Sequence, residues 1–409
     1  MSEGRQERPR RSHASAFAWM AGLSVVTLLL GATREFLIAR ELRASGAADL
    51  FFRGLVAVSA ARVVGLSLYR SRWFPAPREV LGTVLLRQER WVSLAMAGAG
   101  IAALLAIVGP RAWADPTVWV FAVSVTLAVH GSAMRALAER AGRERRGFAL
   151  EWGIPLGTIA GATLLPGGAL GPALGLMVGL AVGVAGVWPA AQCPGGHDTK
   201  SMSSGTGMTT ALLLDALVYA NLGLLDAALS HLFDVGGFAR LNYAYLFVNA
   251  AIMVPSAAAT VVALRASAGD PARVHAKLRR WAVLGGVAGA SAVTAVGLLF
   301  AWPPAAATID RAIGWNVSEQ TGVLILWSAP FAGLRLANTI GRQAQVAADP
   351  RALVPWDLAG IAGRALILGF GAATIGLAAS PIGLAFAELV QLGAWWRGPR
   401  SRAGQRATA

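Results

Sequence analysis

Residues 31–64 read GATREFLIARELRASGAADLFFRGLVAVSAARVV, and this stretch ends one long apolar run and opens the next. Each of the two runs is long enough to cross a bilayer. An ionisable group at that depth costs roughly 2.5–3.5 kcal/mol on insertion scales, so it is kept mainly where it is paired or lines a polar cavity. We therefore expect the first two membrane helices to form part of a substrate path. The ionisable residues concerned are Arg34, Glu35, Asp49, Arg53 and Arg62.

The composition outside this stretch is that of an integral membrane protein. Of 409 residues, 56% are hydrophobic and 14% are charged, whereas soluble domains average roughly 25% charged residues. Apolar runs near 20 residues predict an all-α polytopic membrane protein with twelve transmembrane helices. The runs are 15–39, 47–69, 91–109, 117–138, 148–165, 170–189, 209–231, 238–263, 281–302, 319–337, 353–376 and 380–396.

The basic residues are distributed unevenly between the two sides of this arrangement. If the amino terminus lies in the cytoplasm, most of the 36 Lys and Arg residues fall in cytoplasmic connections or in the two tails. Such a bias predicts that both termini are cytoplasmic. It also accounts for most of the +15 net charge through contact with an anionic leaflet, so we expect no nucleic-acid partner. The connections on the other side carry only Arg40, Arg43, Arg111, Arg240 and Arg311.

The chain is expected to divide into two similar six-helix lobes. The connection 190–208 is rich in Gly, Ser and Thr, which is typical of a flexible linker. The segment GAADLFF at 46–52 has a counterpart, GFARLNY, at 237–243, and Phe52 aligns with Tyr243. An even number of helices per half predicts a parallel repeat with a cavity between the lobes. The expected parts are a basic tail at 1–14, an N-lobe at 15–189, the linker, a C-lobe at 209–396 and a basic tail at 397–409.

No segment carries a catalytic or metal-binding pattern. The five histidines are scattered, and Cys193 is the only cysteine. We therefore expect no enzyme activity, no cofactor and no metal site. The intramembrane charges remain, with Arg34, Asp49, Arg53 and Arg62 as candidate cavity residues. Two alternatives stay open, because Arg53 can pair with Asp49 one turn away and Arg62 can snorkel to the cytoplasmic face.

Two further acidic residues predict a cation site in the second half. Asp226 and Asp357 lie in separate predicted helices and can meet between them. The other interpretation of Asp357 is that it shares one helix face with Arg364, two turns away, through a bridging partner.

Two stretches resemble a known family. LLLGATREFLIARELRASGAADLFF, residues 28–52, is similar to the opening of the MurJ-type (MVN) lipid II flippases of the multidrug/oligosaccharidyl-lipid/polysaccharide (MOP) exporter superfamily. A Gly-x-x-Arg-acid signature, a Gly-rich turn and Asp-Ala-Phe-Phe occur there in the same order. LLDAALSHLFDVGGFARLNYAYLFVNAAIMVP, residues 224–255, resembles the family's helix 7 to helix 8 region.

The resemblance implies roles for individual residues. Arg34, Asp49 and Arg62 match cavity positions implicated in binding the pyrophosphate of a lipid-linked substrate. Asp226 matches an acidic position implicated in coupling to Na⁺ or H⁺ in some members. The chain departs from the family in ending after twelve predicted helices, where typical members have two more. It also departs in lacking the family's residues at Leu28, Val58, Ser59, Val63 and Leu246.

We accordingly expect a transporter of the bacterial cytoplasmic membrane that flips a polyprenyl-pyrophosphate-linked glycan to the outer leaflet by alternating access. Its partners would be the lipid-linked glycan, membrane lipid and proteins of cell-envelope biosynthesis. Asp49 is expected to pair with Arg240 and close an outer gate. Two alternatives remain: a multidrug-type (MATE-like) exporter of small amphipathic or cationic molecules, and a transporter-fold scaffold subunit.

Overall fold

The computed structural model describes residues 13–73, 80–192, 223–266, 271–313, 318–348 and 353–396. Over these residues the secondary structure is helical, without strands, which confirms the expected all-α class. The first half contains α1 (His13–Leu42), α2 (Gly46–Trp73), α3 (Gly82–Gln88), α4 (Arg90–Val108), α5 (Pro116–Arg140), α6 (Glu144–Leu164) and α7 (Leu170–Ala191). The second half contains α9 (Gly223–Ala228), α10 (Gly237–Ala266), α11 (Pro271–Ala301), α12 (Pro303–Ile313), α13 (Ser318–Ala348), α14 (Val354–Ile375) and α15 (Ala379–Trp396).

Six segments of the described chain are long and apolar enough to cross a membrane. The chain is therefore a multi-pass membrane protein. Eleven of the predicted apolar runs coincide with a helix, and the run 209–231 is described only from 223 on. Cys193 and most of the predicted linker 190–208 also lie outside the described residues. The short helices α3 and α12 were not predicted, because neither is an apolar run long enough to span a bilayer.

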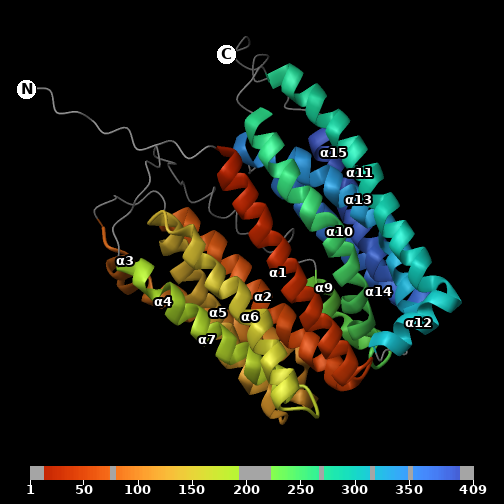
Figure 1. Cartoon of the computed structure of the whole chain (residues 1–409), viewed down its shortest axis with the longest axis horizontal. Coiled ribbons are helices and arrows are strands. Elements are labelled where there is room, and N and C mark those ends of the chain that lie inside the picture. The colour runs from red at the N-terminus through yellow and green to blue at the C-terminus, as the bar shows by residue number, and fades with distance from the viewer. Residues whose placement is uncertain are drawn as a thin grey trace, which may run out of the picture.

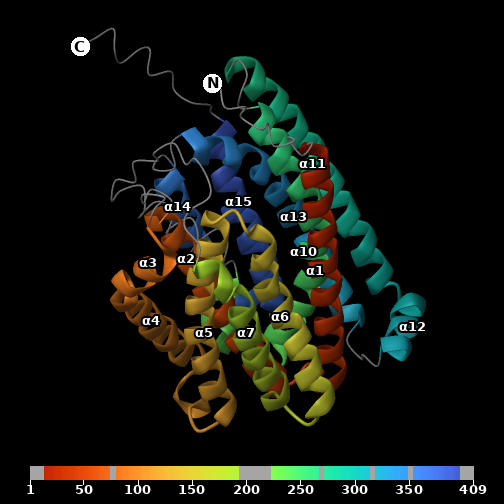
Figure 2. The same ribbon diagram turned by 60° about the vertical axis from the view of Figure 1, so that its left-hand side comes forward.

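The helices form two groups (Figure 1). In the N-terminal group, α1–α7, α2 packs on α4 and α5, and α7 packs on α5 and α6. In the C-terminal group, α9–α15, α13 packs on α10, α11 and α15, and α14 packs on α15. Helix α1 contacts both α6 and α10 and so lies along the boundary between the groups, as Figures 1 and 2 show.

Glycines permit the close approach of α6 and α7. They recur every four residues on both helices, as Gly153, Gly157 and Gly161 on α6 and Gly171, Gly175 and Gly179 on α7. A Cβ atom on Gly157 would overlap the carbonyl oxygen of Gly175, and one on Gly175 would overlap that of Gly157. Small residues at this spacing are the usual means of bringing membrane helices into backbone contact.

Gly175→Val is therefore expected to destabilise the protein by about 1–3 kcal/mol, because the new side chain must push two backbones apart. The measurement is the thermal unfolding midpoint in detergent. Gly98→Val on α4 is the matched control, because nothing lies within 4 Å of a Cβ built there. An equal loss of stability in both variants would contradict the role of the α6–α7 contact.

Candidate functional site

The turn between α1 and α2 is built from local polar contacts. Arg43, the residue after α1, has a φ of 52°, in the left-handed region. The Ser45 hydroxyl donates to the Leu42 carbonyl at 2.6 Å and accepts the Ala48 amide N–H at 3.3 Å. Ser45 therefore acts as an N-terminal cap of α2. This tight turn brings Asp49, in the first turn of α2, towards the C-terminal group.

Asp49 joins the two groups through the start of α10. Its buried carboxylate accepts the Gly236 amide N–H at 2.7 Å and the Ala239 amide N–H at 2.8 Å. These N–H groups have no partner within α10 itself, so Asp49 caps the helix from another part of the chain. Gly236 has a φ of 80°, and a Cβ atom there would overlap the Ala44 carbonyl. The glycine is thus required both by its backbone conformation and by the contact.

The predicted partner of Asp49, Arg240, lies one residue beyond Ala239. Both side chains are described, and neither a hydrogen bond nor an ion pair joins them. The structure therefore brings together the two elements of the predicted gate, with backbone amides in the place expected for the guanidinium. The direct Asp49–Arg240 pair stays a prediction.

Aromatic contacts surround this polar link. Phe52 and Tyr243, which align in the internal repeat, meet with ring centroids 5.3 Å apart, and the Tyr243 hydroxyl donates to the Arg43 carbonyl at 2.9 Å. Phe36 and Phe247 lie 6.0 Å apart between α1 and α10. We call the region of residues 43–52 and 236–247 the junction. The polar contacts between the groups are thus made close to the α1–α2 turn, while α9 also packs on α2 and α4.

The remaining predicted arginines of the first two helices have different surroundings. Arg34 forms an ion pair with its neighbour Glu35, and both side chains are largely buried. The Arg53 Nε atom is buried without a hydrogen-bond partner among the described residues. Arg62 donates from Nη1 to Glu151 Oε2 on α6 at 2.7 Å. The four predicted cavity residues therefore do not converge on one point.

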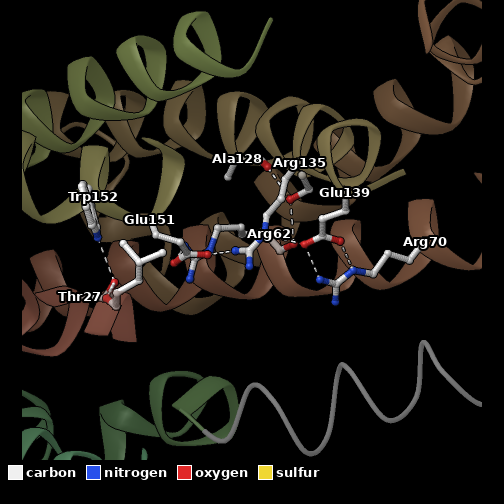
Figure 3. A network of polar contacts seen from close by, with 10 residues as sticks. Thr27, Arg62, Arg70, Ala128, Arg135, Glu139, Glu151 and Trp152 are labelled. Atoms are coloured by element: carbon white, nitrogen blue, oxygen red, sulfur yellow. Dashed lines mark hydrogen bonds and ion pairs between the residues drawn. The ribbon is translucent and has the colours of Figure 1, made fainter. Parts of the chain in front are cut away.

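Arg62 instead begins a row of alternating charges in the N-terminal group (Figure 3). Glu151 binds both Arg62 and Arg135 of α5. Arg135 Nε donates to Glu139 at 3.1 Å, and Arg70 donates two bonds of 2.6 Å to the same carboxylate. We call these five residues the charge row. Sequence reasoning missed Glu151, Arg135 and Glu139, although the spacing of Arg135 and Glu139 on one helix was a usable signal.

Asp226 lies in a buried cluster of the C-terminal group. Arg364 Nη2 lies 2.6 Å from Asp226 Oδ2, and the Ser380 hydroxyl donates to Oδ1 at 2.6 Å. The Tyr245 hydroxyl lies 2.5 Å from that of Ser380. Asp226, Arg364 and Ser380 are almost fully buried. A guanidinium thus occupies the side of Asp226 that a bound cation would take.

Asp357 has a separate partner. Gln391 Nε2 donates to Asp357 Oδ1 at 3.1 Å. Asp357 and Arg364 lie seven positions apart on α14, which is roughly 10 Å along the helix axis. The structure therefore gives the two acidic residues of the predicted cation site different contacts. Within the described residues, no three His, Cys, Asp or Glu side chains are grouped so that they could hold a metal ion.

A third buried ion pair was not predicted. Arg335 Nη1 of α13 donates to Glu388 Oε1 of α15 at 2.8 Å, and the Asn338 amide donates to Oε2 at 2.6 Å. Both helices contribute buried polar atoms to an otherwise apolar interface, so the contact fixes their register.

No protein-family model matches the chain, and no curated protein matches it. Solved structures do match. A lipid II flippase MurJ in an inward closed conformation superposes with a TM-score of 0.73 at 12% identity, covering 93% of this chain and 87% of that one. An inward-facing multidrug resistance MATE family transporter of the MOP superfamily superposes with a TM-score of 0.66 at 14% identity, covering 95% and 99%.

A mutant of the Vibrio cholerae MATE transporter VcmN also matches, with a TM-score of 0.60 at 15% identity and coverage of 95% and 98%. At these identities the likeness concerns the fold. The chain therefore has the fold shared by MurJ and the MATE transporters.

Proposed function

We propose that the protein flips a polyprenyl-pyrophosphate-linked glycan from the cytoplasmic to the outer leaflet of a bacterial cytoplasmic membrane. The proposal includes twelve membrane helices in two six-helix lobes, with both termini in the cytoplasm. The observation that carries it is the charge row, in which three arginines face two glutamates inside the apolar N-terminal group. A net positive site at this position suits an anionic head group.

Arginine suits this head group for chemical reasons. Its planar guanidinium pairs bidentately with phosphate oxygens and remains charged inside the membrane. Arg62 and Arg135 are about a quarter exposed, so a ligand can reach them. Arg53, and Arg34 in its pair with Glu35, lie nearer the junction. The fold shared with a MurJ lipid II flippase supports the same class of substrate.

In this proposal the junction is the outer gate. The bonds from Asp49 to the start of α10 hold the two groups together at one end, and Arg240 adds a favourable charge beside the carboxylate. Alternating access then requires these bonds to break when the gate opens. A coupling ion, Na⁺ or H⁺, would act at Asp226, where it must compete with Arg364.

Leaflet exchange in reconstituted vesicles tests the proposal. Labelled lipid II and a generic undecaprenyl-pyrophosphate sugar would be supplied to the wild type, Arg34→Ala and Arg62→Ala. We expect movement of one lipid, reduced at least about tenfold in both variants, since a lost charged hydrogen bond is worth roughly 1.5–3 kcal/mol. Arg111→Ala is the control, because this exposed arginine belongs neither to the charge row nor to the junction. Absence of movement by a folded wild type would overturn the proposal.

A second candidate function is export of small amphipathic or cationic molecules. The superposition with the two MATE transporters extends over nearly their whole length, 99% of one and 98% of the other. This candidate predicts that acidic residues, above all Asp226, dominate activity and that the arginines tolerate replacement. A third candidate function is that of a scaffold subunit. It predicts that both the acidic residues and the arginines tolerate replacement.

A further inference from the structure

The charge row contains a pair of arginines whose shared partner is a single carboxylate. Glu151 Oε2 accepts from Arg62 Nη1 at 2.7 Å, and its other oxygen, Oε1, is bound by Arg135 Nη1. The arginines come from α2 and α5, and the glutamate comes from α6. Two guanidinium groups on separate helices therefore converge on one anionic group (Figure 3).

Neighbouring contacts hold the Arg135 side chain and the Arg62 backbone in place independently of Glu151. Arg135 is also bonded to Glu139, which is itself fixed by two bonds from Arg70. The Ser132 hydroxyl donates to the Arg62 carbonyl at 2.8 Å and so ties α2 to α5 beside the pair. If Glu151 moves away, Arg135 keeps one carboxylate partner, and Arg62 loses the one that it has within the described residues.

The position of the pair suits a head group entering from one leaflet. Arg62 lies eleven residues before the end of α2, or roughly 16 Å along the helix. Glu151 lies seven residues after the start of α6, or roughly 10 Å from the same end of the bundle. The side chains of Arg62, Arg135 and Glu151 are 25%, 23% and 17% exposed. The pair therefore lies roughly two to three helical turns from this end of the bundle, and its side chains are partly exposed.

We propose that Glu151 is an internal stand-in for the substrate's diphosphate, which displaces it from Arg62 and Arg135. This inference rests on the proposed function and adds a selectivity device to it. A phosphodiester of the bulk membrane lipids carries one negative charge, as Glu151 does, and gains little from the exchange. A diphosphate carries more charge and more acceptor oxygens, so it can bind both guanidinium groups more strongly than the carboxylate does. Glu151 thereby excludes abundant single-phosphate lipids from the site.

Calorimetric binding to the full-length protein in detergent tests the inference. The probes are inorganic pyrophosphate, farnesyl diphosphate and the water-soluble phosphodiester dioctanoyl phosphatidylglycerol. For Glu151→Gln we expect about tenfold tighter binding of both diphosphates and a gain of phosphatidylglycerol binding, because the competing charge is gone. Adding Arg62→Ala to Glu151→Gln should remove the gain.

Glu89→Gln is the matched control. Glu89 binds Arg72 of α2 at 2.7 Å, so its replacement makes the same change in charge and also frees one arginine. We expect the affinities of Glu89→Gln to stay within about threefold of wild type, since among the described residues no second guanidinium is bonded to the Glu89 carboxylate. An equal gain in Glu89→Gln, or no gain in Glu151→Gln, would overturn the inference.

Two further measurements keep the outcomes distinct. If Glu151→Gln fails to fold, Glu151→Asp serves instead, because the shorter side chain loosens the same contact and should give a smaller gain in the same direction. Leaflet exchange by the wild type, without a gain in binding by either variant, would reject this inference alone. A gain in binding, without leaflet exchange by the wild type, would reject the proposed function. It would still support a diphosphate-binding site at Arg62 and Arg135.

Discussion

Asp49→Asn is expected to reduce leaflet exchange by roughly thirtyfold or more. The carboxylate accepts two backbone N–H groups of α10, and charge-assisted bonds of this kind contribute roughly 1.5–3 kcal/mol each. The amide of Asn keeps one acceptor oxygen and turns an NH₂ group towards a donor. A loss of about 2–3 kcal/mol shifts the balance between closed and open junctions by roughly thirty- to a hundred-and-fiftyfold. The measurement is lipid movement in vesicles.

Asp234→Asn is the control for this variant. Asp234 is exposed and lies just before α10, so the same chemical change is made beside the junction without touching its bonds. The charge-swapped variant Asp49→Arg with Arg240→Asp separates two forms of the gate. We expect no rescue, because an arginine cannot accept the α10 amides. Full rescue would instead support a direct pair between the two side chains.

Arg364→Ala is expected to destabilise the folded protein by about 3–5 kcal/mol, the usual effect of removing one partner from a buried ion pair. It leaves the almost fully buried Asp226 carboxylate with the Ser380 hydroxyl as its remaining partner in the described cluster. The measurement is the unfolding midpoint in detergent. Adding Asp226→Asn to Arg364→Ala should recover much of the loss, because no unpaired charge then remains.

The same variant tests the proposed coupling ion. With Arg364 present, we expect the unfolding midpoint to differ only slightly between NaCl and KCl at equal ionic strength, because a cation must compete with the guanidinium for Asp226. In Arg364→Ala, a cation that binds the folded state should raise the midpoint as its concentration rises. Stabilisation by Na⁺ that is equal in the wild type and in Arg364→Ala would show that the cation binds somewhere other than beside Asp226.

Much of the fold could be predicted because a membrane helix is a local property of the sequence. A run of about 20 apolar residues satisfies the bilayer wherever it occurs. The ends of the helices were less predictable. Helix α2, for example, continues past its apolar run through Arg70 and Arg72 to Trp73. These basic residues bind Glu139 and Glu89, which supports the final turn. Such partners are not visible in an apolar run.

The site was predictable in its residues and not in its contacts. Arg62 and Asp49 were recognisable because a charged side chain inside an apolar run costs free energy and is usually paired or functional. The partner of Arg62 lies 89 residues away, and the partners of Asp49 lie 187 and 190 residues away. The latter are backbone amides, which no side-chain pattern reveals. Spacing within one helix can predict a pair such as Arg135 and Glu139, whereas pairing across helices depends on how they pack.

The placement of the junction also has a mechanical consequence. It lies at the first turns of α2, a helix of 28 residues, which is about 42 Å long at 1.5 Å per residue. A rigid rotation of about 10° around such a pivot would displace the far end of the helix by roughly 7 Å. In the proposed transport cycle, a rearrangement of a few bonds at Asp49 would therefore open a gap of roughly 7 Å at the opposite end of the bundle.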